Sequence, residues 1–341
     1  MKFNKNEFGW KEKVNTNELP DDLSIGNSLT VGIRIRDIGQ YSVAEGYQNT
    51  ASGECSHAEG ESTTASGITS HAEGESTIAS GECSHAEGCY TEASGNYSHA
   101  EGEETTASGN CSHAEGSYTT ASGECSHAEG EASNLATDII QDLSSSTSND
   151  DILTAWNTNK FSLAKGEASH VEGKDNLALG DFSHAEGSNT TASGENSHAE
   201  GNYTTASGNI SHAEGDWTVA SGYYSHAEGT GSTASGIASH AEGSGTKASS
   251  SNQHVQGKYN IEDTENKYAH IVGNGTSNTK RSNAHTLDWQ GNDWYKGELY
   301  TGGTSQSDAN KVLTTANISF NESGELVVTI GNVTKIFVPK Q

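Results

Sequence analysis

A fourteen-residue repeat, S-H-A-E-G-x-x-T-x-A-S-G-x-x, dominates the sequence and recurs with little change from Ser56 to Ser122. Histidines lie fourteen residues apart from His57 to His127, and a second array keeps this spacing from His170 to His254. Thirteen of the fifteen histidines therefore fall on one period. A short fixed period is typical of a solenoid, in which each coil stacks only on its neighbours.

Each coil has room for two short strands and two tight turns, because a helical hairpin repeat needs about 33 residues. S-H-A-E-G and T-x-A-S-G are the expected strands, and each ends in a glycine that permits the positive φ of a tight turn. Hydrophobic residues make up only 30% of the chain, so interior positions are alanine, serine and glycine. A coil this thin buries little apolar surface, so the stack needs caps or oligomerisation to remain folded.

The fold class predicted is all-β: a trimeric parallel β-roll solenoid of fourteen-residue coils with a small β-rich C-terminal domain. Residues 1–40 lack the repeat and are interpreted as an N-terminal cap or attachment segment. The first array spans 41–137, an insertion spans 138–160, and the second array spans 161–257. Residues 258–341 form the predicted C-terminal tip and trimerisation domain.

Two segments outside the repeat carry local signals of their own. In the insertion, D-D-I-L-T-A-W is weakly helical, and Ser148 and Asp151 are spaced like a capping box. Near the C-terminus, T-L-D-W-Q-G-N-D-W-Y-K-G-E-L-Y predicts a hairpin, and three alternating stretches after residue 317 predict strands.

The formal net charge of −28 excludes nucleic acid and anionic membrane surfaces as expected partners, since like charges repel. No apolar run approaches the about 18 residues of a membrane-spanning helix, so no membrane insertion is expected. The segment MKFNKNEFGW lacks an apolar signal-peptide core, which predicts a protein made in the cytoplasm and released by lysis. Cys55, Cys83, Cys111 and Cys125 stand two residues before a repeat histidine, in a slot expected to be half-buried, and are predicted to be free thiols.

The repeat, with S-V-A-E-G at 42–46 and A-S-G in the second half of each coil, resembles the YadA-like head repeat of trimeric autotransporter adhesins. The resemblance covers about 41–256 and implies a left-handed parallel β-roll with three chains side by side about one axis. This chain has histidine and glutamate where that family places valine and isoleucine.

The segments K-Y-A-H-I-V-G-N-G and S-N-A-H-T-L-D-W-Q-G-N-D-W-Y-K-G-E-L-Y are similar to C-terminal modules of bacteriophage tail-fibre and tail-spike proteins. That resemblance implies a trimeric phage tail appendage with other tail or baseplate proteins as partners.

The histidine and glutamate of each coil are two residues apart in a strand, so they point to the same face. We expect both columns to face the trimer axis, where burial beside glutamate favours imidazolium and stability falls as pH rises from about 6 to about 9. A solvated face and a metal ladder are the alternatives; identical rungs lack the outer-shell variety of a dedicated metal site, so neither metal nor cofactor is expected. The trimer-interface candidates are His57, Glu59, His71, Glu73, His85, Glu87, His99, Glu101, His113, Glu115, His127, Glu129, His170, Glu172, His184, Glu186, His198, Glu200, His212, Glu214, His226, Glu228, His240 and Glu242.

No enzymatic activity and no catalytic residues are expected. Serine adjoins histidine in almost every coil, whereas a catalytic site needs a nucleophile, a base and an orienting group that converge in one pocket.

The residue five positions after the repeat histidine varies in type and often is aromatic, which suggests a surface for stacking on carbohydrate. The alternatives are scattered turn aromatics without a role and, for Trp289 and Trp294, the core of the C-terminal domain. A neighbouring threonine column, Thr63 to Thr119, raises the alternative of an ice-binding face. The receptor-binding candidates are Trp156, Tyr90, Tyr118, Tyr203, Trp217, Trp289 and Trp294.

The function predicted from these patterns is that of a homotrimeric, receptor-binding appendage on the tail or surface of a phage or phage-derived particle. Its partner would be a host-surface receptor, with glycans among the candidates. The alternative is a bacterial surface adhesin built on the same β-roll.

Overall fold

The computed structural model describes residues 39–132, 148–158 and 160–296, together with the backbone of β1 (Ser28–Ile33) and of five short C-terminal strands. The chain divides into two compact units, Met1–Ser193 and Gly194–Gln341. The predicted attachment segment lies outside the described residues except for β1, which pairs in parallel with β2 as a first rung.

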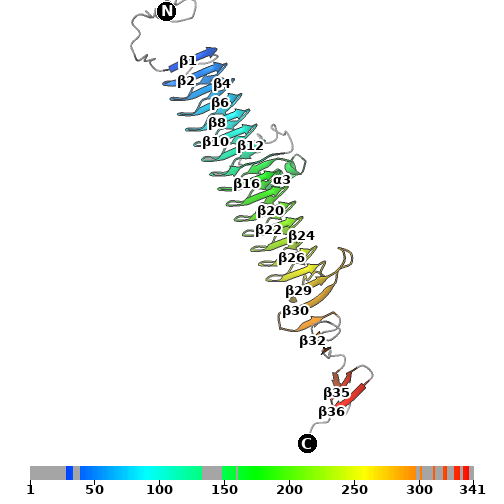
Figure 1. Cartoon of the computed structure of the whole chain (residues 1–341). Helices are drawn as coiled ribbons and strands as arrows, with labels where there is room; N and C mark the ends of the chain where they lie inside the picture. The colour runs from blue at the N-terminus through cyan, green and yellow to red at the C-terminus, as the bar shows by residue number, and fades with distance from the viewer. Residues whose placement is uncertain are drawn as a thin grey trace, which may run out of the picture. The chain divides into compact units, whose positions relative to one another are not determined.

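The first unit is a parallel β-solenoid in which each coil gives one strand to each of two sheets (Figure 1). Neighbouring rungs pair in register one repeat apart, His57 opposite His71 and Ala65 opposite Ala79. The histidine-bearing sheet holds β1, β2 (Ser42–Tyr47), β4 (His57–Glu61), β6 (His71–Glu75), β8 (His85–Cys89), β10 (His99–Glu103), β12 (His113–Ser117), β14 (His127–Ala128), β16 (His170–Lys174) and β18 (His184–Ser188). The second sheet holds β3 (Thr50–Ala51), β5 (Thr64–Ala65), β7 (Ile78–Ala79), β9 (Glu92–Ala93), β11 (Thr106–Ala107), β13 (Thr119–Ala121), β15 (Ser162–Ala164), β17 (Leu177–Ala178) and β19 (Thr191–Ala192).

The second unit continues the same coil design and then changes to antiparallel pairing. Its parallel strands are β20 (His198–Asn202), β22 (His212–Asp216), β24 (His226–Thr230), β26 (His240–Ser244), β28 (His254–Lys258) and β29 (Tyr268–Asn274), with β21 (Thr205–Ala206), β23 (Val219–Ala220), β25 (Thr233–Ala234) and β27 (Lys247–Ala248) in the second sheet. The antiparallel strands are β30 (Asn283–Asp288), β31 (Asp293–Tyr295), β32 (Tyr300–Thr301), β33 (Asn310–Lys311), β34 (Ile318–Phe320), β35 (Leu326–Ile330) and β36 (Val333–Phe337). The predicted hairpin is confirmed as β30–β31, and the predicted terminal strands as β34–β36.

The core of each coil is narrow and built from alanine, serine and threonine. The alanines of H-A-E and of A-S-G are fully buried, as at Ala58 and Ala65. The serine before each repeat histidine from His57 to His240 is also buried. In the first array its hydroxyl is satisfied locally, as where Ser56 Oγ donates to the Gly53 carbonyl at 2.8 Å. In the second array the corresponding hydroxyls make no hydrogen bond with the described residues, at Ser169, Ser183, Ser197, Ser211, Ser225 and Ser239. The threonine column proves to be interior, with Thr63 and Thr77 fully buried. This burial removes the surface that an ice-binding face would need.

The two glycine columns serve different purposes, and the expectation of positive φ at both corners is wrong for one of them. The glycine after glutamate has positive φ, 106° at Gly60. The A-S-G glycine does not, but a Cβ added at Gly53 would overlap the backbone carbonyl of Gly67 in the next coil. At that corner the positive φ falls instead on non-glycine residues such as Cys55 and Tyr97.

The insertion interrupts one coil and adds no coils of its own. His127 pairs directly with His170, and β13 pairs with β15, so the stack continues without an added coil. Glu131 still bridges Ser117 and Lys174, so the chain remains in the stack up to that residue. Its described part is the helix α3 (Asn149–Thr158), and residues 133–147 lie outside the described residues. One half of the predicted capping box is confirmed, because the Asp151 amide donates to Ser148 Oγ at the start of the helix. The Asp151 carboxylate accepts from the Ser148 hydroxyl.

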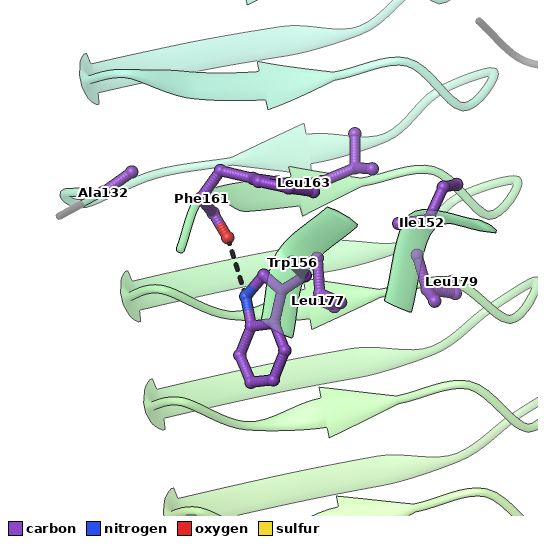
Figure 2. Close-up of a cluster of buried hydrophobic side chains, with 7 residues drawn as sticks. All are labelled: Ala132, Ile152, Trp156, Phe161, Leu163, Leu177 and Leu179. Carbon is purple, nitrogen blue, oxygen red and sulfur yellow. Dashed lines mark hydrogen bonds between the residues drawn. The ribbon is translucent and has the colours of Figure 1, made fainter. Parts of the chain in front are cut away.

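Helix α3 is held against the solenoid by an apolar cluster, shown in Figure 2. The Trp156 indole nitrogen donates to the Phe161 carbonyl at 3.1 Å, and Lys165 Nζ donates to Asn149 Oδ1 at 2.9 Å. The cluster consists of Ala132, Ile152, Trp156, Phe161, Leu163, Leu177 and Leu179. The leucines stand where other coils have threonine or serine, because here the second sheet is covered.

Removing residues 138–160 in favour of a short Gly/Ser linker is therefore expected to destabilise the solenoid by a few kcal/mol, because it uncovers three leucines, each worth about 1.5–3 kcal/mol when buried. Adding L163T, L177T and L179S to the deletion restores the residue types of uncovered coils and should recover most of the loss. Urea unfolding of the three proteins provides the measurement. Equal stability of the deletion and the wild type would contradict the packing role.

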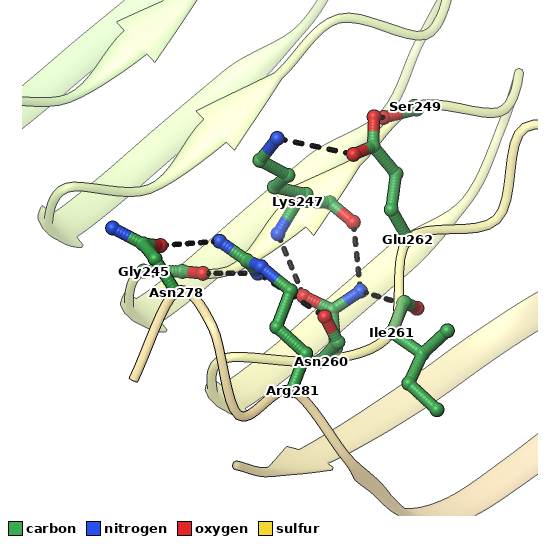
Figure 3. A network of polar contacts seen from close by, with 8 residues as sticks. All are labelled: Gly245, Lys247, Ser249, Asn260, Ile261, Glu262, Asn278 and Arg281. Carbon is green, nitrogen blue, oxygen red and sulfur yellow. Dashed lines mark hydrogen bonds and ion pairs between the residues drawn. The ribbon is translucent and has the colours of Figure 1, made fainter. Parts of the chain in front are cut away.

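Side chains close the end of the second sheet, in which β27 is the last strand among the described residues (Figure 3). The Lys247 amide donates to Asn260 Oδ1 at 2.7 Å, and Asn260 Nδ2 donates to the Lys247 carbonyl at 2.9 Å, which imitates the missing strand. Arg281 Nη1 donates to the Gly245 carbonyl at 2.8 Å. Glu262 accepts hydrogen bonds from Ser249 and Lys247. The hydrogen-bonding groups of this edge are thus satisfied within the chain.

Among the described residues, no helix has both the length and the apolar character needed to cross a membrane.

Candidate functional site

The histidine and glutamate columns form two continuous ladders on the outer side of the histidine-bearing sheet. In each H-A-E-G strand the alanine points into the coil, so the flanking histidine and glutamate point out and remain about one-third exposed. Neighbouring imidazoles stack with ring centroids 4.7–4.9 Å apart and planes within 13° of parallel, from His57 to His184 in the first unit and from His198 to His254 in the second. The structure therefore brings the predicted interface residues of each unit together on one face.

Each imidazole nitrogen lies between the carboxylates of its own coil and of the preceding coil. His113 Nε2 is 3.8 Å from both Glu101 Oε1 and Glu115 Oε2. In the second unit the ladder is tighter, and His226 Nε2 lies 3.1 Å from Glu214 Oε1. The buried Nε2 atoms of several other ladder histidines make no hydrogen bond with the described residues: His57, His71, His85, His99, His113, His127 and His170 in the first unit, and His212 and His254 in the second.

Within a single chain, the surroundings of His85, His127 and His198 favour neutral imidazole, whereas the sequence analysis expected imidazolium in a trimer interface. Burial lowers the pKa of His85, and the charges of His71 and His99 lower it further, against the opposing effect of Glu87 and Glu73. The pKa values of His127 and His198 are lowered in the same way, by burial first and by neighbouring histidines second. Stacked imidazoles hinder one another's protonation, a cooperative effect that is absent from a single His–Glu pair.

Beside the ladder in the first unit runs an open groove of about 1110 Å³, lined by the glutamates and glycines of successive coils from Glu59 to Gly173. The glycines lack side chains, so the carboxylates stand at an accessible edge.

The aromatic candidates occupy left-handed turns at the surface. Tyr90 and Trp217 are 55% and 59% exposed with φ of 58° and 57°. Tyr203 and Trp217 stack on adjacent coils with ring centroids 4.3 Å apart, which forms a flat apolar surface. Tyr118 is half-buried, because it packs against the insertion cluster.

Trp156 was predicted as a receptor-binding residue, and its environment argues against that role. Only 7% of its surface is exposed, and its indole nitrogen is already hydrogen-bonded within the insertion cluster. The substitutions L-A-K-G and L-A-L-G for T-A-S-G were the sequence signal that this insertion packs on the roll.

The column two residues before each histidine is a second exposed surface that the sequence did not indicate. It was expected to be half-buried, but Tyr97 is 60% exposed and Phe182 is 52% exposed. The cysteines Cys55, Cys83, Cys111 and Cys125 share this exposed position and are free. Outward-pointing left-handed turns explain why the column tolerates such varied side chains.

The C-terminal hairpin carries a small pocket of about 200 Å³ beside Trp294 and Tyr295. His285 Nε2 contacts Asp293 Oδ1, and Tyr295 donates to Asp293 Oδ2 at 3.0 Å. Burial raises the pKa of Asp293, but the hydrogen bonds from His285 and Tyr295 outweigh it and hold that pKa below its usual value. Trp289 and Trp294 are 44% and 48% exposed, so within the described chain they do not fill a core.

Comparison with known families identifies YadA head domain repeats along the roll. The matched residues are 58–81, 100–123, 172–197, 185–209, 199–225 and 227–246. These matches end at residue 246 and do not reach the C-terminal segment, where the tail-fibre-like module stays a prediction. No curated protein matches the chain. The chain thus carries YadA-type head repeats, folded as a parallel β-solenoid in which histidine and glutamate form the outward ladder.

Proposed function

We propose that this chain is a surface adhesin whose β-roll presents exposed aromatic side chains to a receptor on a host surface. The observation that carries the proposal is the match of the coils to YadA head repeats on a rigid parallel stack. The tail-fibre interpretation rested on the C-terminal segment alone, so the adhesin, initially the alternative, is now the better-supported function.

The surface best suited to a receptor is the aromatic pair in the second unit. Tyr203 and Trp217 present stacked rings from backbone turns that the coil fixes, so little conformational entropy is lost on binding. Stacked aromatic faces suit the apolar faces of sugar rings and the side chains of proteins. Repetition of the surface in an oligomer would add avidity to weak individual contacts.

The receptor surface can be tested with Y203N/W217N. Asparagine occupies the same turn at Asn189 with φ of 57°, so the fold should survive. We expect at least about a tenfold loss of binding to the receptor, as measured on arrays of surface glycans and on immobilised extracellular-matrix proteins.

A matched control is I210N/Y224N, which removes exposed apolar side chains from the other turn column of the same unit. Asn196 shows that asparagine fits there as well. W294A tests the C-terminal pocket separately. Retained binding by Y203N/W217N would reject the aromatic pair, and absence of binding by the wild type to every surface tested would reject the adhesin function.

We also propose a homotrimer in which the histidine and glutamate ladders of three chains face one another. The proposal is supported by the partly exposed histidine and glutamate side chains that successive coils repeat on one face. It also agrees with the assembly that the head-repeat resemblance implies.

Light scattering is therefore expected to give three times the chain mass of 35.7 kDa at micromolar concentration. Changing the ladder of several adjacent coils to lysine should give dissociated or unfolded chains, because like charges would meet at the interface. A stable folded monomer of the wild-type chain would end this proposal.

A further inference from the structure

The ladder places nitrogen and oxygen donors in repeated groups of three. In each group two histidines of adjacent coils and the glutamate between them hold their donor atoms within 4.8 Å of one another. We propose that these triads bind divalent transition-metal ions such as Zn²⁺ or Ni²⁺ along the roll. Triads of this kind are His85–Glu87–His99, His113–Glu115–His127, His170–Glu172–His184 and His212–Glu214–His226.

The donor spacing suits an ion of this size. Zinc binds imidazole nitrogen at about 2.0–2.1 Å and carboxylate oxygen at about 2.0–2.2 Å. His113 Nε2 and Glu115 Oε2 are 3.8 Å apart, a separation that one ion bound to both atoms spans. The donor atoms of a whole triad lie within 4.8 Å of one another, so the second imidazole must tilt towards the ion by roughly an ångström. The side chains of the triad that holds His113 and Glu115 are partly exposed, which leaves them room for that adjustment.

Several imidazole nitrogens and carboxylates of the ladder lack partners that a bound cation would supply. The Nε2 atoms of His85, His99 and His113 are buried and make no hydrogen bond among the described residues. Glutamates repeat with every coil along the ladder, so their carboxylates repel one another. A divalent cation supplies an acceptor for the nitrogen lone pair and neutralises the carboxylate at once.

Successive triads lie close together along the ladder. His99 ends one triad and stacks at 4.8 Å on His113, which begins the next, so ions bound at every coil would be only one coil apart. Because charges this close repel, we expect saturation at roughly one ion for every two coils. The groove beside the glutamates gives ions a route to the ladder from solvent.

The mixture of imidazole and carboxylate donors predicts which metal ions bind. Imidazole ligands favour zinc, nickel, copper and cobalt, whereas calcium and magnesium prefer all-oxygen sites. The exposed glutamates Glu75 and Glu103 lie two residues beyond the triad positions in the same strands and have no histidine column beside them. Comparing these glutamates with those of the triads separates two effects of an added cation: general attraction to carboxylates and coordination by histidine and glutamate together.

The test uses the full chain after treatment with EDTA and dialysis at pH 7.5. Zinc or nickel chloride is added, bound metal is counted by elemental analysis after gel filtration, and melting is followed by circular dichroism. We expect bound zinc to approach one ion per two coils and the melting temperature to rise by at least about 5 °C. Calcium and magnesium at equal concentration should neither bind at this stoichiometry nor raise the melting temperature.

Two triple variants separate coordination from simple charge effects. E87Q/E115Q/E172Q removes one ligand from each of three triads, whereas E75Q/E103Q/E82Q makes the same change in charge outside them. The first should lose about three zinc ions and the corresponding part of the thermal shift, and H85Q/H113Q/H170Q should behave likewise. Equal zinc binding by the ladder and control variants, or an equal response to calcium, would overturn the proposal.

The inference does not depend on the proposed trimer, since each triad is complete within one chain. Light scattering with and without metal reports assembly, and elemental analysis reports binding. A monomer that binds zinc would reject the trimer alone, and a metal-free trimer that ignores zinc would reject the metal sites alone.

Discussion

Replacing Gly208 with alanine is expected to lower the free energy of unfolding by about 3 kcal/mol, although the new side chain is a single methyl group. A Cβ there would overlap the Gly222 carbonyl oxygen and lie 2.6 Å from the Gly222 carbonyl carbon. Both atoms belong to the backbone of the next coil, so no side-chain rotation can relieve the clash. The coils would have to separate, which breaks the hydrogen bonds of the ladder.

Gly231 offers a matched control in the same unit. It adopts φ of 65° in the turn where other coils hold Tyr203 and Trp217, and the nearest atom to an added Cβ is 4.0 Å away. G231N should change stability by less than about 0.5 kcal/mol. Urea unfolding curves of the two variants and the wild type give the comparison. Coincident curves for all three would show that the close approach of coils is not needed for stability.

Acidification from pH 7.5 to about 5.5 is expected to lower the melting temperature by several degrees. The pKa values of His85, His127, His198 and His270 are lowered in the folded chain, first by burial and second by neighbouring histidines. Between each folded pKa and the ordinary value of 6.5 the unfolded chain binds more protons. Stability is therefore fully present above that ordinary value and is lost as pH falls towards the folded pKa.

The pH measurement is made by calorimetry with EDTA present, so that ion binding does not contribute. H85Q/H127Q/H198Q removes three of the four groups and should flatten the pH dependence without abolishing it. For His85, the facing groups are His71, His99, Glu73 and Glu87, so the variant leaves its glutamates in place. A melting temperature that rises on acidification would instead support imidazolium in the ladder.

Much of the architecture follows from the period alone. Fourteen residues with glycines at fixed places and alanines on alternate positions permit only a small coil with an alanine core, and the structure has such coils. Alternation within H-A-E-G also places histidine and glutamate on one face, since side chains in a strand alternate. The helix cap at Ser148 and the hairpin at Asp288–Asp293 were predictable because their signals are local.

Other features depend on contacts between residues that are distant in sequence, and only the tertiary structure decided them. The sequence could not show that Trp156 meets Leu163 and Leu177, because burial of the helix depends on where an interrupted coil rejoins the stack. The pKa of His85 likewise depends on imidazoles stacked at 4.8 Å, since His71 and His99 of the neighbouring coils lower it more than its own Glu87 raises it. The repeat determines the backbone path and core of each coil, whereas the stacking of coils determines the surroundings of each side chain.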